Sequence, residues 1–166
     1  MVLGKEIPRI DELAKGISAG VFHALIRMGY GFDAQDVSEV SAGLACLASS
    51  YLEVTSNKGK TFRVSSQTVA DFIKGLLARR LAGELDALPS EGVIFERMDI
   101  TAQEKMRQKV ISEAYRVCDL SLEKVTEMNL DVFLRANNFT ALHAVTASHA
   151  ARLVLPYVSD HEGFVR

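Results

Sequence analysis

The amino-acid sequence predicts an all-α protein, a compact bundle of about six helices. Apolar residues recur three and four positions apart through most of the chain, and helix-capping residues precede several of these stretches. Only three prolines and eleven glycines occur among 166 residues, so few positions oppose helix. One segment differs: residues 53–64 alternate in β-type character around a turn at Gly59, which makes a short β-hairpin there the non-helical alternative.

Before residue 31 one helical segment is expected, unbroken or divided into two short helices. Residues 8–17 carry apolar side chains at helical spacing after an early proline. Gly16 and Gly20 lie four positions apart, which either admits a neighbouring helix or marks a break between two short helices. Gly29 and Gly31 are expected to end this segment, because glycine tolerates the left-handed conformation of a helix C-terminus.

The remaining helices are predicted from their apolar stripes and from the capping residue before each stripe. They are expected over residues 37–51, 68–85, 101–120, 122–136 and 140–155, with caps at Asp33 or Asp36, Ser65 or Ser66, Thr101, Ser121 and Thr140, in that order.

The chain is expected to form one domain over residues 1–166, with a core of about 8–157 and a tail at 158–166. Its 19 basic and 21 acidic residues nearly balance, which argues against nucleic acid or an anionic membrane as a partner. No targeting leader or membrane-spanning stretch is recognisable, so a cytoplasmic protein is expected. Cys46 and Cys118 are isolated and predicted to be buried free thiols.

Polar side chains interrupt the otherwise apolar segment near the N-terminus. His23, Arg27 and Tyr30 occupy positions i, i+4 and i+7, which places them on one face of a helix. Burying such groups without partners costs a few kcal/mol each. They must therefore meet a ligand, solvent or hydrogen-bonding partners within the fold, and a purely structural role for His23 remains an equal alternative.

A second polar face lies near the C-terminus. His143, Thr146 and His149 follow at i, i+3 and i+6, with Arg152 three positions further on. The two histidines lie about 120° apart around a helix, so one ligand is not expected to reach both, although Thr146 can hydrogen-bond to either. Neither His-x-x-x-His nor Glu-x-x-His occurs, so no metal site is predicted, while a site combining His23 with one of these histidines stays geometrically open.

These two faces lie within motifs that resemble a known family. The stretch GISAGVFHALIRMGY at 16–30 resembles the central motif of the questin oxidase-like proteins. The stretch LHAVTASHAARLVLPY at 142–157 resembles their C-terminal motif, and the two occur in the family's order. Family members are longer, so the chain is expected to be a shortened relative that corresponds to their C-terminal part.

The resemblance implies a helical oxidoreductase that is linked to NADPH and oxygenates an aromatic or polyketide-like substrate by Baeyer–Villiger chemistry. It also implies a small-molecule substrate. The implied catalytic residues are His23, His143 and His149, and the implied substrate- or cofactor-binding residues are Arg27, Tyr30, Thr146 and Arg152.

The competing hypothesis is a non-catalytic helical module that binds a ligand or a partner protein. It treats the His and Arg faces as internal polar networks, and it is supported by the absence of any flavin or nicotinamide fingerprint in the sequence. Under either hypothesis a homodimer is expected, because a shortened chain must cover the packing surface that it lacks.

Overall fold

The computed structural model describes residues 10–53, 66–81, 96 and 112–165. The described residues form helices and no named strand, which confirms the all-α prediction. Of the predicted hairpin at 53–64, all but Glu53 lies outside the described residues. The elements are α1 (Ile10–Ala14), α2 (His23–Asp33), α3 (Val37–Ser49), α4 (Val69–Leu81), α7 (Leu122–Ala136), α8 (Phe139–Val154), the 3-10 helix η1 (Leu155–Tyr157) and α9 (His161–Val165).

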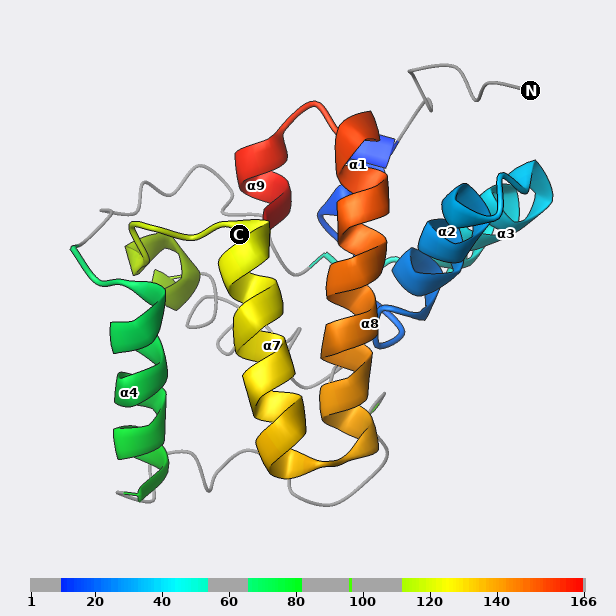
Figure 1. Cartoon of the computed structure of the whole chain (residues 1–166). Coiled ribbons are helices and arrows are strands. Elements are labelled where there is room, and N and C mark those ends of the chain that lie inside the picture. Colours follow the sequence, from blue (N-terminus) through cyan, green and yellow to red (C-terminus); the bar gives the residue numbers. More distant parts are fainter. Residues whose placement is uncertain (1–9, 54–65, 82–95, 97–111, 166) are drawn as a thin grey trace.

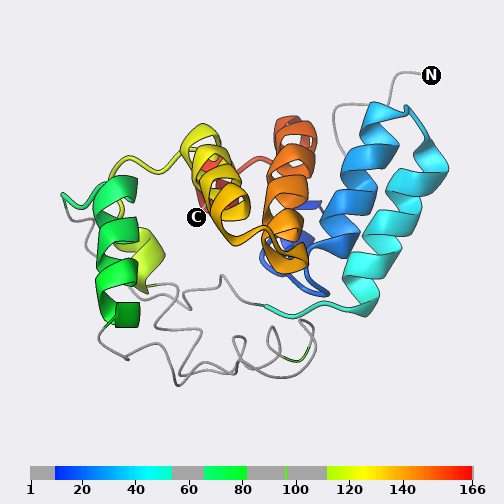
Figure 2. The same ribbon diagram turned by 60° about the horizontal axis from the view of Figure 1, so that its bottom comes forward.

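The larger helices lie across the molecule in the order α4, α7, α8, α2, α3 (Figures 1 and 2). Helices α7 and α8 form an antiparallel pair in the middle, and α2 and α3 form a second antiparallel pair beside α8. The core lies where α2, α3 and α8 meet, and apolar side chains from all three helices are buried there. Its fully or almost fully buried members include Leu25, Met28, Leu47, Ala150 and Val154.

Glycines allow α2 to approach both of its neighbours closely. A Cβ atom at Gly29 would lie 2.5 Å from the Cβ of Ala150, and one at Gly31 would lie 2.6 Å from the backbone nitrogen of Val40. Helix α2 therefore continues through both glycines to Asp33, and the prediction that they end the helix was wrong. Their role is to remove side chains at two helix–helix contacts, which outweighs the low helix propensity of glycine.

Gly29→Ala tests this close approach. The added methyl group has no space against the backbone of Ala150, so we expect a loss of about 1–3 kcal/mol in the free energy of unfolding. Gly75→Ala in α4 is the matched control, because nothing lies within 4 Å of its added Cβ. The control should be neutral or more stable by about 0.5–1 kcal/mol. Urea denaturation measures both variants, and equal effects would contradict the packing argument.

A left-handed turn leads into α2. The residues between α1 and α2 form turns, which confirms the alternative that Gly16 and Gly20 bracket a break between two helices. Gly20, Val21 and Phe22 all have positive φ angles, near 60°. Val21 holds this disfavoured conformation with its side chain only 2% exposed, so burial offsets a backbone cost of about 1–2 kcal/mol.

Two of the five predicted helix caps are confirmed, and Thr101 lies outside the described residues. Asp36 accepts hydrogen bonds from the amides of Ser38 and Glu39, and Ser121 accepts one from the amide of Lys124.

At α4 the prediction of Ser65 or Ser66 was wrong, because the hydroxyl of Thr68, directly before Val69, accepts from the amide of Asp71. At the start of α8 the prediction of Thr140 was wrong. Asn138 is the cap and accepts from the amide of Ala141, because α7 ends at the left-handed Asn137 and α8 begins directly afterwards.

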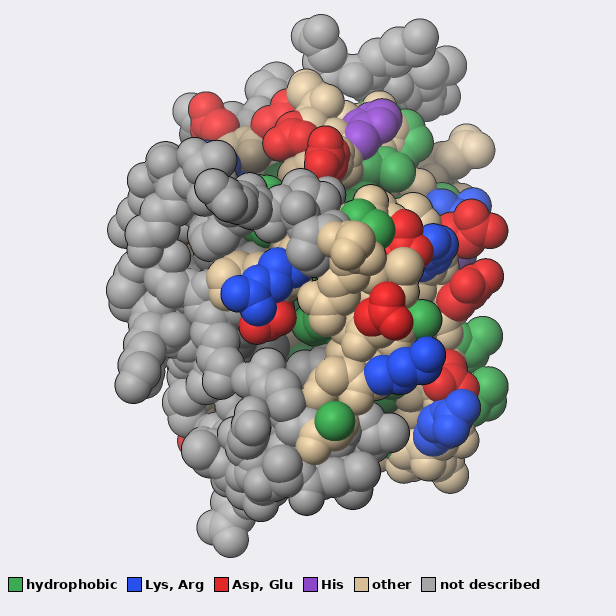
Figure 3. Space-filling view, turned by 90° about the vertical axis from the view of Figure 1, so that its left-hand side faces the viewer, with side chains coloured by type: hydrophobic (Ala, Val, Ile, Leu, Met, Phe, Trp, Pro, Cys, Tyr) green, Lys and Arg blue, Asp and Glu red, His purple; other side chains and the backbone are tan. Residues whose placement is uncertain are grey.

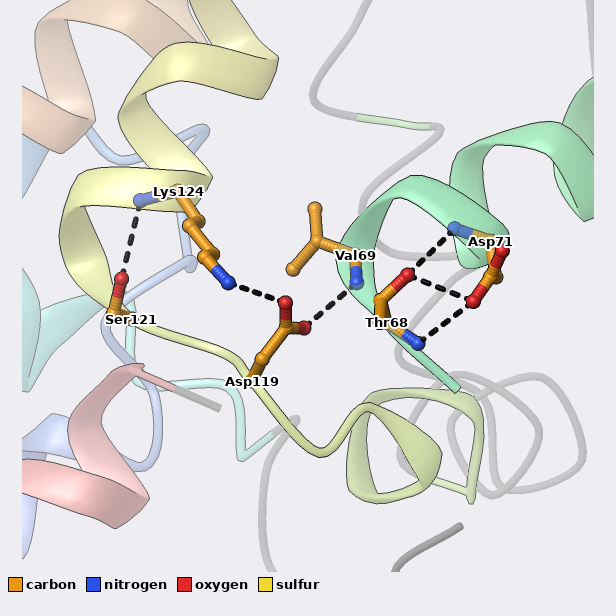
Figure 4. A network of polar contacts seen from close by, with 6 residues as sticks. All are labelled: Thr68, Val69, Asp71, Asp119, Ser121 and Lys124. Atoms are coloured by element: carbon orange, nitrogen blue, oxygen red, sulfur yellow. Dashed lines mark hydrogen bonds and ion pairs between the residues drawn. The ribbon is translucent and has the colours of Figure 1, made fainter. Parts of the chain in front are cut away.

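Asp119 joins the start of α4 to the start of α7 (Figure 4). Its carboxylate accepts from the backbone amide of Val69 at 2.8 Å and from the ammonium group of Lys124. These two donors, Lys124 foremost, lower the pKa of the Asp119 carboxyl group. Thr68 and Asp71 complete the first turn of α4 by hydrogen-bonding to each other. A single carboxylate thus organises the junction of two helices.

The segment before Asp119 departs from the predicted helix over 101–120. Residues 101–111 lie outside the described part, and residues 112–116 are helical, but the helix does not reach Leu120. Val117 forms a bridge with Gln67 instead, and the amide of Cys118 donates to the carbonyl of Gln67. The early end leaves Cys118 exposed, so its predicted burial was wrong, while both cysteines are free as expected.

Asp119→Ala is expected to loosen α4 without affecting the α2–α8 contact. Backbone amides of α4 should exchange with solvent faster in the variant, whereas Asp160→Ala, which removes the α9 cap, should leave them unchanged. Because the pKa of Asp119 is lowered, its stabilisation is present above the ordinary carboxyl pKa of about 4 and is lost as the pH falls through the lowered value. Unchanged exchange in α4 would contradict this.

The chain after η1 packs back onto the fold. Val158 is buried in the core, and Phe164 of α9 is partly buried against the same core cluster. The carboxylate of Asp11 accepts from the amide and the hydroxyl of Ser159, at 2.7 and 2.9 Å. These contacts tie residues 158–165, expected from the sequence as a tail, to the first described helix. Among the described helices, none is long and apolar enough to cross a membrane.

Candidate functional site

The two predicted polar faces meet at one pair of histidines. His23, the first residue of α2, and His143, in the second turn of α8, come from positions 120 residues apart. Their Nε2 atoms lie 3.0 Å apart, which is hydrogen-bonding distance, and their rings are inclined at 66° with centroids 5.0 Å apart. His143 is only 6% exposed, whereas His23 is exposed to solvent. The pair therefore has one inner and one outer imidazole.

A backbone carbonyl orients the inner imidazole. The Nδ1 atom of His143 lies 2.7 Å from the carbonyl oxygen of Phe139, one turn earlier in α8. A carbonyl can only accept, so Nδ1 of His143 carries a proton, and whenever this ring is neutral its Nε2 is the unprotonated nitrogen. The hydrogen bond to His23 then requires that Nε2 of His23 donates. One anchored tautomer thus sets the protonation pattern of both rings.

The aromatic ring of Phe139 also contacts His143. The two rings meet edge to face, at 87° with centroids 4.4 Å apart, although the Phe139 side chain is 71% exposed. An exposed phenylalanine beside a histidine pair is a suitable surface for stacking a flat aromatic molecule. Sequence analysis did not identify Phe139, and the one available signal was its position four residues before His143, where a helical carbonyl lies within reach of the side chain.

Arg27 has a partner within the protein. Its Nε and a terminal amino group donate to the two carboxylate oxygens of Glu39 in α3, at 2.7 and 3.2 Å. This bidentate contact raises the pKa of Arg27 and lowers that of Glu39. Glu39 was not identified from the sequence, because only the turn between α2 and α3 brings it opposite Arg27. The guanidinium group is thus engaged in holding two helices together.

The other predicted site residues lie near the histidine pair in sequence but do not join it. The Thr146 hydroxyl donates to the carbonyls of Leu142 and His143 in its own helix. Tyr30 is 56% exposed, and His149 and Arg152 are exposed on α8. Within the described part of the chain, no hydrogen bond or ion pair joins these three side chains to another residue. The structure thus brings together two of the three predicted catalytic histidines.

The Nε2 atoms of His23 and His143 are the best candidates for metal ligands. They converge on one region, and the Nδ1 bond of His143 to a carbonyl is the orienting contact that metal-binding histidines commonly make. A third ligand is not supplied by the described residues, which contain no group of three His, Cys, Asp or Glu side chains able to hold a metal ion. The geometry of the described residues therefore supports a proton-sharing pair or half of a metal site.

The acidic lining of one cavity is a poor match for a nicotinamide dinucleotide. This cavity, of about 540 Å³, lies at α1 and α9, away from the histidine pair. Three carboxylates, Asp11, Glu12 and Asp160, outnumber one cation, Lys15, in its lining. Acidic side chains gather at this end of the molecule (Figure 3). Such a lining repels the diphosphate of NADPH. No step involving that cofactor is therefore derived from these residues.

The comparison with protein families agrees with the two motifs. A family model described as Questin oxidase-like matches residues 2–165. The chain belongs to the questin oxidase-like family. The match extends over nearly the whole sequence, and so covers α2, α8 and the histidine pair that joins them. Comparison with curated proteins and with solved structures finds no match to this chain.

The assigned tautomers can be tested by nitrogen-15 NMR of the imidazoles at neutral pH. We expect His143 to be protonated at Nδ1 and unprotonated at Nε2, and His23 to be protonated at Nε2. Loss of the Nε2 proton of His23 with Nδ1 of His143 still protonated indicates a bound metal instead. A protonated Nε2 in neutral His143 contradicts the carbonyl anchor. The exposed ring of His161 in α9 serves as the unpaired reference.

Proposed function

We propose that this member of the questin oxidase-like family is an oxidoreductase that oxygenates a planar aromatic or polyketide-like substrate. The observation that carries the proposal is the 3.0 Å contact between Nε2 of His23 and Nε2 of His143. The ring of Phe139, exposed beside this pair, supplies a surface for a flat substrate. The family resemblance supplies the reaction class.

The reaction class requires proton transfers. A Baeyer–Villiger oxygenation inserts one atom of dioxygen next to a ketone carbonyl and releases the other as water, which consumes two electrons and two protons. A histidine with an accessible nitrogen can deliver or accept such protons near neutral pH. We assign this role to the outer ring, His23, and the positioning role to the inner ring, His143. The two electrons would come from NADPH, the reductant that the family resemblance implies, and no described residue is assigned to bind it.

The deciding experiment incubates the purified protein with an anthraquinone, NADPH and ¹⁸O₂ and detects oxygenated product by mass spectrometry. We expect His23→Gln to lower kcat by about 100- to 10,000-fold, because it removes a proton-transfer group. His161→Gln is the matched control, since His161 is exposed on α9 away from the pair, and its rate should equal that of the wild type. Metal content is measured in every sample.

The second candidate function is a non-catalytic module that binds a ligand or a partner protein. It is favoured by the Arg27–Glu39 pair, which occupies the arginine that an anionic substrate would need. If the wild type forms no product, holds no metal and gains no thermal stability from any aromatic ligand, the oxidoreductase proposal is wrong. In that case His23→Gln should change only the free energy of unfolding.

A further inference from the structure

The outward face of α7 carries leucines that contribute nothing to the core. Leu130 and Leu134 lie one helical turn apart and are 45% and 70% exposed, and no residue of α7 is buried. Helix α7 contacts α8 through a different face, where Asn129 donates to the carbonyl of Ala144 and to the hydroxyl of Ser148. In the space-filling view, hydrophobic side chains at the right-hand edge stand beside both acidic and basic ones (Figure 3).

An ion pair with spare hydrogen-bonding capacity lies beside these leucines. The Nε of Arg135 donates to both carboxylate oxygens of Asp131, at 2.9 and 2.8 Å. Both side chains are more than half exposed. The two terminal amino groups of Arg135 make no hydrogen bond or ion pair with another described residue, and together they hold four N–H donors. The Asp131 carboxylate likewise retains lone pairs that can accept further bonds.

This arrangement is complementary to itself. In a two-fold symmetric pair of antiparallel helices that cross near residues 132 and 133, Leu130 of each copy meets Leu134 of the other. The same symmetry places Arg135 of each copy opposite Asp131 of the other. The free amino groups of each arginine then meet the carboxylate across the axis, and the two intrahelical pairs become one ring of four alternating charges.

We propose that the occupant of this face is a second copy of the chain, bound through an antiparallel α7–α7 contact. The proposal goes beyond the oxygenase function and does not depend on it. One stripe of two leucines buries less than the roughly 800 Å² per partner of a standard stable interface. The dimer is therefore weak and reversible, and forms as the protein concentration rises.

Sedimentation velocity over a roughly hundred-fold range of concentration, up to about a millimolar, tests the proposal. The wild type should shift from monomer to dimer. Leu134→Ser, Asp131→Arg and Arg135→Asp should each raise the dissociation constant about tenfold or more, because the last two place like charges across the axis. The double variant Asp131→Arg/Arg135→Asp restores the charge pattern and should dimerise as the wild type does. Val37→Ser, an exposed apolar residue of α3, is the control and should have no effect.

A wild type that stays monomeric at every concentration overturns the proposal. A dissociation constant that is unchanged by Leu134→Ser and by both single charge reversals also overturns the proposal, since the contact then lies on another surface. Circular-dichroism melting of each variant separates loss of dimerisation from loss of folding. Recovery in the double variant cannot arise from misfolding of the single variants, so that result supports the α7–α7 contact directly.

Discussion

The close approach of α2 to α8 is the constraint on which the rest of the structure depends. Gly29 and Ala150 leave no room for larger side chains, so the two helices meet almost backbone to backbone. This contact fixes how far apart the helices lie two turns earlier, where His23 faces His143. A distance of 3.0 Å between two imidazole nitrogens is sensitive to small displacements of either helix. The packing of α2 against α8 in the core therefore also sets the geometry of the candidate site.

Polar contacts fix the outer helices around this centre. The bidentate Arg27–Glu39 pair joins α2 to α3 on the solvent side, where exposed ion pairs contribute little stability but define which surfaces face each other. Asp119 joins α4 to α7 in a similar way, by accepting from Val69 and from Lys124. The apolar core sets the distances between helices, and these carboxylates set which helix ends are joined.

The sequence predicted helix starts correctly where the stabilising contact joins residues that are close together in the chain. Asp36 and Ser121 cap α3 and α7 as expected, because a side-chain acceptor at a helix start acts over three residues. Gly29 and Gly31 were misread as helix ends, since their neighbours in space, Ala150 and Val40, are set by the tertiary fold. The cap of α8 was misplaced by two residues because both Asn138 and Thr140 are good capping types.

The same distinction applies to the candidate site. Helical spacing identified His23 and His143 as polar residues in need of partners, and the family resemblance joined them. Spacing alone predicted neither Glu39 as the partner of Arg27 nor Phe139 as the anchor of His143. The Arg27–Glu39 contact depends on the direction that the turn between α2 and α3 gives the chain. The acceptor for His143 is a backbone carbonyl, and the type of residue that carries it gives no indication of that role.

The anchor on Phe139 has a consequence for how the histidine pair can separate. Phe139 is the first residue of α8, and the first turn of a helix opens more readily than its middle, at a free-energy cost below that of unfolding the whole domain. When that turn opens, the carbonyl no longer holds Nδ1 of His143, and the inner ring is free to rotate away from His23. We therefore expect local opening of this one helical turn to separate the histidine pair at a lower free-energy cost than unfolding of the whole fold.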